Sequence, residues 1–207
     1  MEDLSQQHWE NIYQTKNSNE VSWTQEKPNI SLQLIQQCNL LKTASIIDIG
    51  GGDSNLVDYL LQEGFENITV LDISKKALEK AQQRLGKLAE KVKWIVSDIT
   101  KFNPTETYDL WHDRAAFHFL TQPNDVANYI KIASKAINRN MIIGTFSTNG
   151  PTKCSGLTIQ QYNETGLTEI FSSSFTKNNC TLHQHTTPFN TTQEFIFCSF
   201  IKNKSII

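Results

Sequence analysis

A strand that runs directly into three consecutive glycines, with a helix behind them, constrains the fold of this chain most strongly. Residues 45–49 read SIIDI, a helical pattern covers 56–62, and a second apolar run at 68–71 ends in Asp72. The glycines are Gly50, Gly51 and Gly52. Glycines at such a turn let a ligand approach the backbone, and an acidic residue about 20 positions later can hold ribose hydroxyls. The pattern predicts a nucleoside-cofactor site in a doubly wound α/β fold.

The chain beyond residue 44 alternates between strand and helix patterns. Strands are expected at 45–49, 67–72, 92–96, 107–112 and 140–146. Helices are expected at 54–63, 75–89, 124–137 and 158–171. The β-rich runs at 175–187 and 193–201 have no helix between them and should pair as an antiparallel hairpin. We therefore expect a Rossmann-like, doubly wound α/β fold with a mostly parallel seven-stranded sheet that ends in this hairpin.

The helix expected at 75–89 has the clearest pattern. Ser74 can cap its first turn. Its apolar stripe consists of Ala77, Leu78, Ala81, Leu85 and Leu88. Side chains three and four residues apart share one face of a helix, so this stripe should pack against the sheet.

The first 42 residues are predicted to form a helical cap on an α/β core of 43–207, the two together making one domain of 1–207. Helical spacing is found at 8–13 and at 29–37, where Pro28 begins the second helix. Because the cap precedes the first strand, it can lie across the carboxyl ends of the strands as a lid.

The aromatic residues of this cap have two possible roles. Trp9 and Tyr13 share an apolar cluster with Ile12, and we expect both to belong to the core rather than to a ligand site. Trp23 can either close over a bound cofactor or anchor the cap by ordinary burial.

Composition narrows the possible partners. The formal net charge of −2 argues against a surface built for nucleic acid, and the chain has no apolar run of the length that spans a membrane. Its polar, acidic N-terminus is wrong for a secretory signal. The cysteines, Cys38, Cys154, Cys180 and Cys198, form no C-x-x-C pair. Their scatter predicts reduced thiols in a cytoplasmic protein. The sequence gives no basis for predicting the oligomeric state.

The residues around the glycines favour one class of cofactor. A dinucleotide fingerprint would have a glycine where this chain has Asn55. Asp48, beside the loop, would repel a pyrophosphate and suits a cofactor that carries a sulfonium and an ammonium. Asp72 can accept hydrogen bonds from both ribose hydroxyls. Asp98 and Ile99, after the third strand, offer a carboxylate and an apolar wall to an adenine. Each feature also has a plain reading, in which the glycines are only a tight turn, Asp72 a helix cap and Asp98 a turn residue.

This ordered set resembles the class I S-adenosylmethionine-dependent methyltransferases over roughly residues 45–200. The segment 48–52 matches the glycine loop of that family, Asp72 its ribose acid and 97–99 its adenine site, while Ser54 stands at the third family glycine. The resemblance implies S-adenosylmethionine as cofactor and S-adenosylhomocysteine as product. The expected cofactor-binding residues are Trp23, Asp48, Gly50, Gly51, Gly52, Asp72, Ile73, Asp98, Ile99 and His112.

A narrower likeness concerns the segment after the fourth strand. Residues 111–116, WHDRAA, look like the corresponding stretch of thiopurine S-methyltransferases, although His112 intervenes and Ala115 replaces a glycine. The cap, with Trp9 and Trp23, also looks like that family and like small lysine methyltransferases.

Asp113 and Arg114 are the candidate catalytic residues. Asp113 or His112 could take a proton from the acceptor, and Arg114 could stabilise an anionic acceptor such as a thiolate or orient its carboxylate. A thiolate acceptor would need no base. The alternative is a structural ion pair between Asp113 and Arg114. No metal is expected, since His183 and His185 have no third ligand.

The leading functional hypothesis is therefore methyl transfer to a small molecule, possibly at sulfur or selenium. A lysine of a protein partner is the second candidate acceptor. A non-catalytic protein that binds S-adenosylmethionine is the third hypothesis, and a nicotinamide-dependent oxidoreductase, which Asn55 argues against, is the fourth. RNA methylation finds no support in the charge of the chain.

Overall fold

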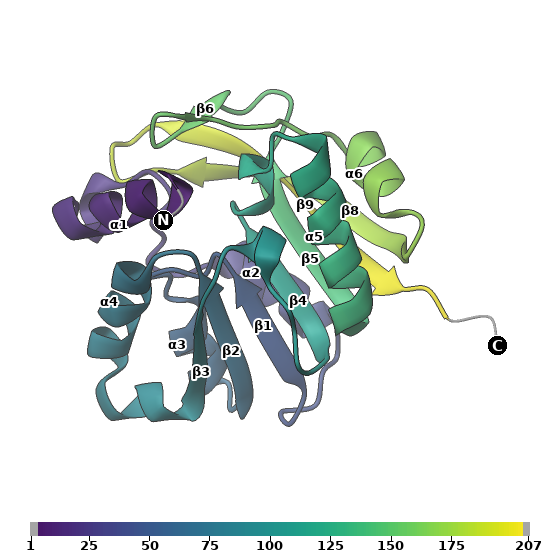
Figure 1. Cartoon of the computed structure of the whole chain (residues 1–207), viewed down its shortest axis with the longest axis horizontal. Helices are drawn as coiled ribbons and strands as arrows, with labels where there is room; N and C mark the ends of the chain where they lie inside the picture. The colour runs from purple at the N-terminus through teal and green to yellow at the C-terminus, as the bar shows by residue number, and fades with distance from the viewer. Residues whose placement is uncertain (1–3, 205–207) are drawn as a thin grey trace.

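The computed structural model describes residues 4–204 and has a seven-stranded sheet at its centre (Figure 1). The strand order is β3-β2-β1-β4-β5-β9-β8. The bounds are β1 Ser45–Ile49, β2 Asn67–Asp72, β3 Val92–Val96, β4 Tyr108–Arg114, β5 Ile137–Phe146, β8 Phe175–Thr186 and β9 Thr192–Lys202. A separate two-stranded ribbon consists of β6 Lys153–Cys154 and β7 Leu157–Thr158.

Strands β1 to β5 are parallel, and β9 runs antiparallel between β5 and β8. The predicted α/β fold with a C-terminal antiparallel hairpin is thus confirmed. Strand β1 lies between β2 and β4. The chain adds β2 and β3 on one side of β1 and then β4 and β5 on the other, so the strand order reverses at this point of the sheet. Ligands of open α/β sheets bind at such a switch point, beyond the carboxyl ends of the strands.

Helices cover both faces of the sheet (Figure 1). The α-helices are α1 Leu4–Thr15, α2 Asn29–Gln37, α3 Leu56–Gln62, α4 Lys75–Leu85, α5 Pro123–Ala136 and α6 Glu164–Phe171. Short 3-10 turns lie at Ser18–Glu20, Gly86–Lys91, Ile99–Lys101 and Phe117–Phe119. One apolar cluster joins α2 and α3 to the sheet through residues such as Ile35 and Leu60, and a second joins α5 and α6 through Tyr129 and Phe171.

Several element boundaries differ from those expected. Helix α4 ends at Leu85, because Gly86 takes a φ of +56° and turns the chain into a 3-10 segment. Leu88 therefore leaves the apolar stripe and is 46% exposed, while the other four residues of the stripe are buried. Ser74 caps α4 as predicted, accepting the Ala77 N–H at 3.1 Å.

The expected helix at 158–171 forms only as α6, from Glu164 onward. Asn163 caps it by accepting the Gly166 N–H at 2.8 Å. The preceding residues are extended, and Tyr162 donates its N–H to the Phe146 carbonyl at the end of β5. Strand β5 begins at Ile137, earlier than predicted, because it follows α5 with no loop between them.

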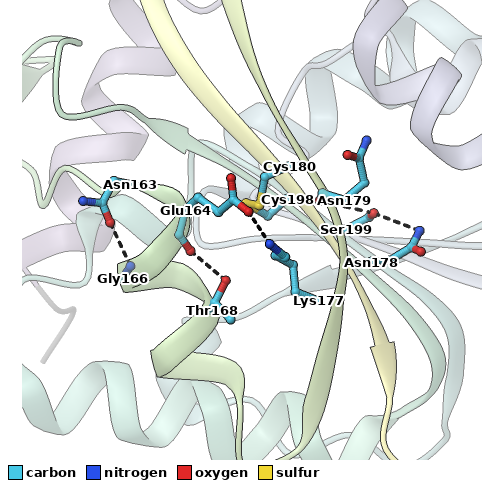
Figure 2. Close-up of a disulfide and its surroundings, with 10 residues drawn as sticks. All are labelled: Asn163, Glu164, Gly166, Thr168, Lys177, Asn178, Asn179, Cys180, Cys198 and Ser199. Atoms are coloured by element: carbon cyan, nitrogen blue, oxygen red, sulfur yellow. Dashed lines mark hydrogen bonds and ion pairs between the residues drawn. A yellow bond between two sulfur atoms is a disulfide. The ribbon is translucent and has the colours of Figure 1, made fainter.

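Two of the cysteines are not free thiols, which corrects the prediction of four reduced cysteines. Cys180 of β8 and Cys198 of β9 face each other across the hairpin and form a disulfide (Figure 2). Figure 2 also shows Lys177 of β8 reaching Glu164 of α6 and Asn178 contacting Ser199. Cys38 and Cys154 are free. The inference of a cytoplasmic location from four reduced thiols therefore loses its basis.

In the part of the chain from residue 4 to 204, none of the helices has both the length and the apolar character that crossing a bilayer requires.

Candidate functional site

A cavity of about 480 Å³ lies where the carboxyl ends of β1, β2 and β4 meet the N-terminal cap. The predicted site residues that line it are Trp23, Asp48, Gly50, Gly51, Asp72, Ile73, Asp98, Ile99, His112 and Arg114. Gly52 and Asp113 are not part of the lining. The structure thus brings together ten of the residues that the sequence singled out, from five separate segments of the chain.

The glycine loop needs glycine for both backbone and space. Gly50 and Gly52 have φ values of +62° and +52°, in the left-handed region that side chains disfavour. A Cβ on Gly51 would lie 2.6 Å from Oδ2 of Asp48, and one on Gly52 would lie 2.6 Å from the Tyr13 hydroxyl. Gly52 therefore sits directly beneath the cap although it does not line the cavity.

Arg84 of α4 fixes the far end of this loop. Its guanidinium donates to the carbonyls of Asp53 and Ser54 at 2.7 and 2.8 Å, and it forms an ion pair with Asp58 of α3. The loop is thus tied to the two helices that flank it.

Asp72, at the end of β2, caps α4 as one of its predicted readings had it, and its predicted ribose-binding role stays a prediction. Its Oδ1 accepts the Ser74 N–H at 2.7 Å, at the start of α4, and the residue also lines the cavity. Burial raises the pKa of this carboxyl to about 7, with a further rise from Asp53 and Asp48, while backbone N–H groups of Ser74 and Gly52 oppose the shift. An acid this strongly perturbed and facing a cavity is typical of a ligand site.

Asp98 forms the turn that follows β3. Its Oδ1 accepts the Thr100 N–H at 2.8 Å, and its Oδ2 pairs with Lys101 at 3.1 Å. The plain turn reading of this residue therefore holds, and Asp98 and Ile99 also border the cavity. Both readings are compatible, because a carboxylate has acceptor capacity for more than two donors.

His112 lies between two buried partners and has no free ring nitrogen. Its Nδ1 is 2.6 Å from Oδ1 of Asp48, and its Nε2 is 2.9 Å from the Ser31 hydroxyl of α2. The three residues are at most 4% exposed. Because both nitrogens are engaged, His112 is placed to hold Asp48 and the cap, and is poorly placed to take a proton from an acceptor.

Asp113 is fully buried and turned away from the cavity, which does not fit its predicted catalytic role. Its Oδ1 accepts the N–H groups of Ala116 and Phe117 at 3.0 and 3.1 Å, and its Oδ2 accepts the Tyr129 hydroxyl at 2.8 Å. Burial raises its pKa to about 6. Among residues 4–204, Asp113 makes no ion pair with Arg114 either, so the alternative reading is also wrong. The physical reason is that β4 extends to Arg114, which sends alternate side chains to opposite faces.

Arg114 does line the cavity, as expected. Its Nη1 donates to the Trp23 carbonyl at 2.9 Å, and its guanidinium lies 5.2 Å from the centre of the Phe195 ring. Burial lowers the pKa of this arginine to about 10, which leaves it charged at neutral pH. It is therefore a cation between the cap and the end of the sheet.

The cap closes the cavity with aromatic side chains. Trp9 packs against Trp23 and Phe119, with ring centres 5.8 and 5.0 Å apart, and Tyr13 lies 6.3 Å from Trp23. All four line the cavity, and Tyr13 is also one of the buried core residues, as expected. Trp23 lines the cavity and packs within the cap, and its closure over a bound cofactor stays a prediction.

Glu10 of α1 attaches the cap to the core. Its carboxylate accepts the N–H groups of Lys75 and Lys76 at 2.7 and 3.0 Å and the Ser74 hydroxyl at 3.1 Å. The helix N-terminus of α4 favours such a negative charge. In Figure 1, α1 accordingly lies beside α4.

Sequence reasoning missed Ser31 and Glu10. Ser31 is one polar residue in an apolar stretch of α2, and Glu10 is one of several acidic residues in the cap. Their partners are 81 and 64 or more positions away. Only a polar residue inside the apolar spacing of 29–37 could have drawn attention to Ser31.

Comparison with known proteins consistently finds methyltransferases. Residues 46–139 match the model of a methyltransferase domain. A malonyl-[acyl-carrier protein] O-methyltransferase of Anoxybacillus flavithermus is 33% identical over 108 residues, or 51% of this chain. An EEF1A lysine methyltransferase 2 of Mus musculus is 26% identical over 91 residues, or 40% of this chain. These segments span 39% and 37% of the two relatives, so the chain matches well under half of each.

The fold is shared over nearly the whole chain. The N-methyltransferase NodS of Bradyrhizobium japonicum, in complex with S-adenosylhomocysteine, superposes with a TM-score of 0.71 at 17% identity, covering 98% of this chain and 100% of that one. The thiopurine-like segment at 111–116 finds no specific counterpart in these comparisons. Residues 46–139 thus match a methyltransferase domain, and the chain shares the fold of solved S-adenosylmethionine-dependent methyltransferases.

Proposed function

We propose that this chain transfers a methyl group from S-adenosylmethionine to a small-molecule acceptor. The observation that carries the proposal is the shared cavity, in which the glycine loop, Asp72 and Asp98 lie around one space. This is the arrangement that the family resemblance implies for the methionine, ribose and adenine parts of the cofactor.

The chemistry of the cavity wall supports this cofactor over a dinucleotide. Asp48, Asp53 and Asp72 all lie on the glycine-loop side. The negative charge they bring would repel a pyrophosphate and favours a ligand with a sulfonium and an ammonium. Ile73 and Ile99 add apolar surface on which an adenine could rest.

When bound, S-adenosylmethionine supplies a methyl group already activated by the positive sulfur. The chain then has to bind the two reactants, orient them and exclude water from the transfer. Asp72 would hold the ribose hydroxyls, while Trp9 and Trp23 of the cap would cover the reacting groups. Alignment of two reactants can lower a barrier by about 7–11 kcal/mol in favourable cases.

Neither of the two predicted general bases, His112 and Asp113, is free to act at the acceptor end. Both nitrogens of His112 are bonded, and Asp113 is not in the cavity wall. Burial, with a contribution from Arg114, lowers the pKa of His118 to about 3, so this imidazole holds a proton poorly. The proposal therefore favours an acceptor that is already ionised at neutral pH, such as a thiolate or another anion.

A lysine of a protein partner is the second candidate acceptor. It is favoured by the match to the mouse lysine methyltransferase. A lysine must lose a proton before it can attack, and neither His112 nor Asp113, the two predicted bases, is free to take it. A protein that binds the cofactor without turnover is the third candidate.

Calorimetric titration with S-adenosylmethionine, S-adenosylhomocysteine and NAD tests the cofactor. Micromolar binding of the first two and none of NAD would support the proposal, whereas binding of NAD alone would refute it. Radiolabelled S-adenosylmethionine, incubated with separated small-molecule and protein fractions of a cell extract, then distinguishes the acceptors. Label in the small-molecule fraction is expected. Label in protein would favour the lysine acceptor, and no label with tight cofactor binding would favour the non-catalytic candidate.

A further inference from the structure

Arg114 is a charged side chain in the cavity wall without a carboxylate partner in the described part of the chain. Its single hydrogen bond runs from Nη1 to the Trp23 carbonyl. Nε and Nη2 are both shielded from solvent and have no hydrogen-bond partner among residues 4–204. Burying a charged group without its full set of hydrogen bonds costs free energy. The unpartnered guanidinium therefore indicates a binding partner that the isolated chain does not supply.

The other cations of the wall are already paired. Arg84 is bound to Asp58, and Lys101 to Asp98. Asp48 lies near enough to Arg114 to favour its charged form, but the Oδ1 of Asp48 is bonded to His112, and the two residues form no ion pair. Arg114 is thus the cation of this wall that is left for a ligand.

The remaining neighbours of Arg114 are neutral. Burial raises the pKa of the Cys154 thiol to about 11, so it stays protonated despite the arginine. His118 accepts the Phe146 N–H through Nδ1, which places its proton on the unpartnered Nε2. The surroundings of Arg114 therefore contain one positive charge and hydrogen-bond donors, and Asp48, the carboxylate nearby, makes no hydrogen bond with Nε or Nη2.

We propose that Arg114 binds a carboxylate carried by the methyl acceptor. This inference rests on the proposed function and adds the chemical class of the acceptor to it. The two unpartnered groups, Nε–H and Nη2–H, lie on the same edge of the guanidinium and point in parallel. That fork matches the two oxygens of a carboxylate, whereas a thiolate presents one atom. A single negative charge balances the single unpaired cation, which argues against a doubly charged phosphate.

Access to this fork passes through the cap. Nε and Nη2 are covered, and the Trp23 backbone contacts the same guanidinium. The carboxylate therefore enters when the cap segment around Trp23 moves aside, and it is enclosed when that segment returns. Such closure would strengthen the pairing, because charge-assisted hydrogen bonds are stronger away from water.

Calorimetry on the full chain saturated with S-adenosylhomocysteine tests this inference. The probes are benzoate, hexanoate and malonate, each paired with its neutral amide: benzamide, hexanamide and malonamide. The variants are Arg114→Gln, which removes the charge, and Arg114→Lys, which keeps the charge and loses the fork. Arg139→Gln is the matched control, since Arg139 is exposed at the opposite end of β5.

We expect at least one carboxylate to bind about tenfold or more tightly than its amide, with the preference lost in Arg114→Gln, reduced in Arg114→Lys and kept in Arg139→Gln. Equal binding of acids and amides, a preference that survives in Arg114→Gln, or no binding of any carboxylate would overturn the inference. Binding of S-adenosylhomocysteine to each variant checks that it is folded. Failure of the unchanged chain to bind S-adenosylhomocysteine would instead count against the proposed function.

Discussion

Nδ1 of His112 lies 2.6 Å from Oδ1 of Asp48, and the pair is buried at the end of β1 and β4. The imidazole reaches on to Ser31 of α2, so one side chain connects the acid of the glycine loop with the second helix of the cap.

Replacing His112 by Phe should leave Asp48 buried without its partner. An uncompensated buried carboxylate typically costs about 3–5 kcal/mol, so urea denaturation should show a large loss of stability. Ser31→Ala removes only the outer hydrogen bond and should cost about 0.5–1.5 kcal/mol. Equal losses of stability in the two variants would contradict the inference that the bond between His112 and Asp48 contributes more than the one between His112 and Ser31.

Affinity for S-adenosylhomocysteine should rise between pH 6 and pH 8. The pKa of Asp72 is raised to about 7, so its carboxyl gains full acceptor capacity only as the pH passes that value. By the same shift, the contribution of Asp72 to the stability of the free protein is greatest below about pH 4, its unfolded pKa, and is lost as the pH rises toward 7. Calorimetric titrations across this range check the affinity.

Asp72→Asn is the control for this pH dependence. It should bind more weakly at pH 8, by about 2–4 kcal/mol on the scale of hydrogen bonds to a charged group, and should lose the slope between pH 6 and 8. A slope that persists in Asp72→Asn would assign the titration to another group.

Gly52→Ala and Gly64→Ala form a matched pair. Both glycines have positive φ values, +52° and +85°, so each substitution should cost about 1–2 kcal/mol of stability through backbone strain. A Cβ at Gly64 meets open space, whereas one at Gly52 comes within 2.6 Å of the Tyr13 hydroxyl and 3.3 Å of Asp72. Only Gly52→Ala should therefore weaken binding of S-adenosylhomocysteine. Equal affinities in the two variants would show that the crowding at Gly52 is harmless.

Glu10→Ala should loosen the cap. It removes the carboxylate that accepts the N–H groups of Lys75 and Lys76, a loss that costs about 0.5–2 kcal/mol at a helix N-terminus. We expect faster dissociation of S-adenosylhomocysteine in stopped-flow experiments and faster proteolysis within residues 4–42. Glu90→Ala, at an exposed site, is the control. Unchanged dissociation in Glu10→Ala would mean that α1 does not retain the ligand.

Titration of thiols in denaturant should find two per chain, from Cys38 and Cys154. The bond between Cys180 and Cys198 closes a loop with a separation of 18 residues, which on chain-entropy grounds stabilises by about 3 kcal/mol. Cys180→Ala should therefore lower the melting temperature clearly, while Cys38→Ala should change it little. Four free thiols in the untreated protein would refute the pairing.

The sequence was informative where a pattern is local. The glycine loop, Asp72 and the alternation of strand and helix were all visible because each depends on neighbours along the chain. The full length of β4 was not visible in the sequence. The strand continues two residues beyond the predicted end, which buries Asp113 and leaves Arg114 in the cavity wall. The roles of Ser31 and Glu10 depend on partners more than 60 positions away, and the pairing of Cys180 with Cys198 depends on the register of a hairpin.

The attachment of the cap has a kinetic consequence. The Ser74 N–H donates to Asp72, while the Ser74 hydroxyl and the Lys75 N–H donate to Glu10 of the cap. The predicted ribose acid and the anchor of the cap are therefore held by the same turn of backbone. The proposed acceptor site lies at Arg114 of β4, whose guanidinium contacts the cap through the Trp23 carbonyl. This arrangement favours a compulsory order, in which the cofactor binds first and the acceptor second. Steady-state inhibition by S-adenosylhomocysteine would then be competitive with the cofactor and noncompetitive with the acceptor.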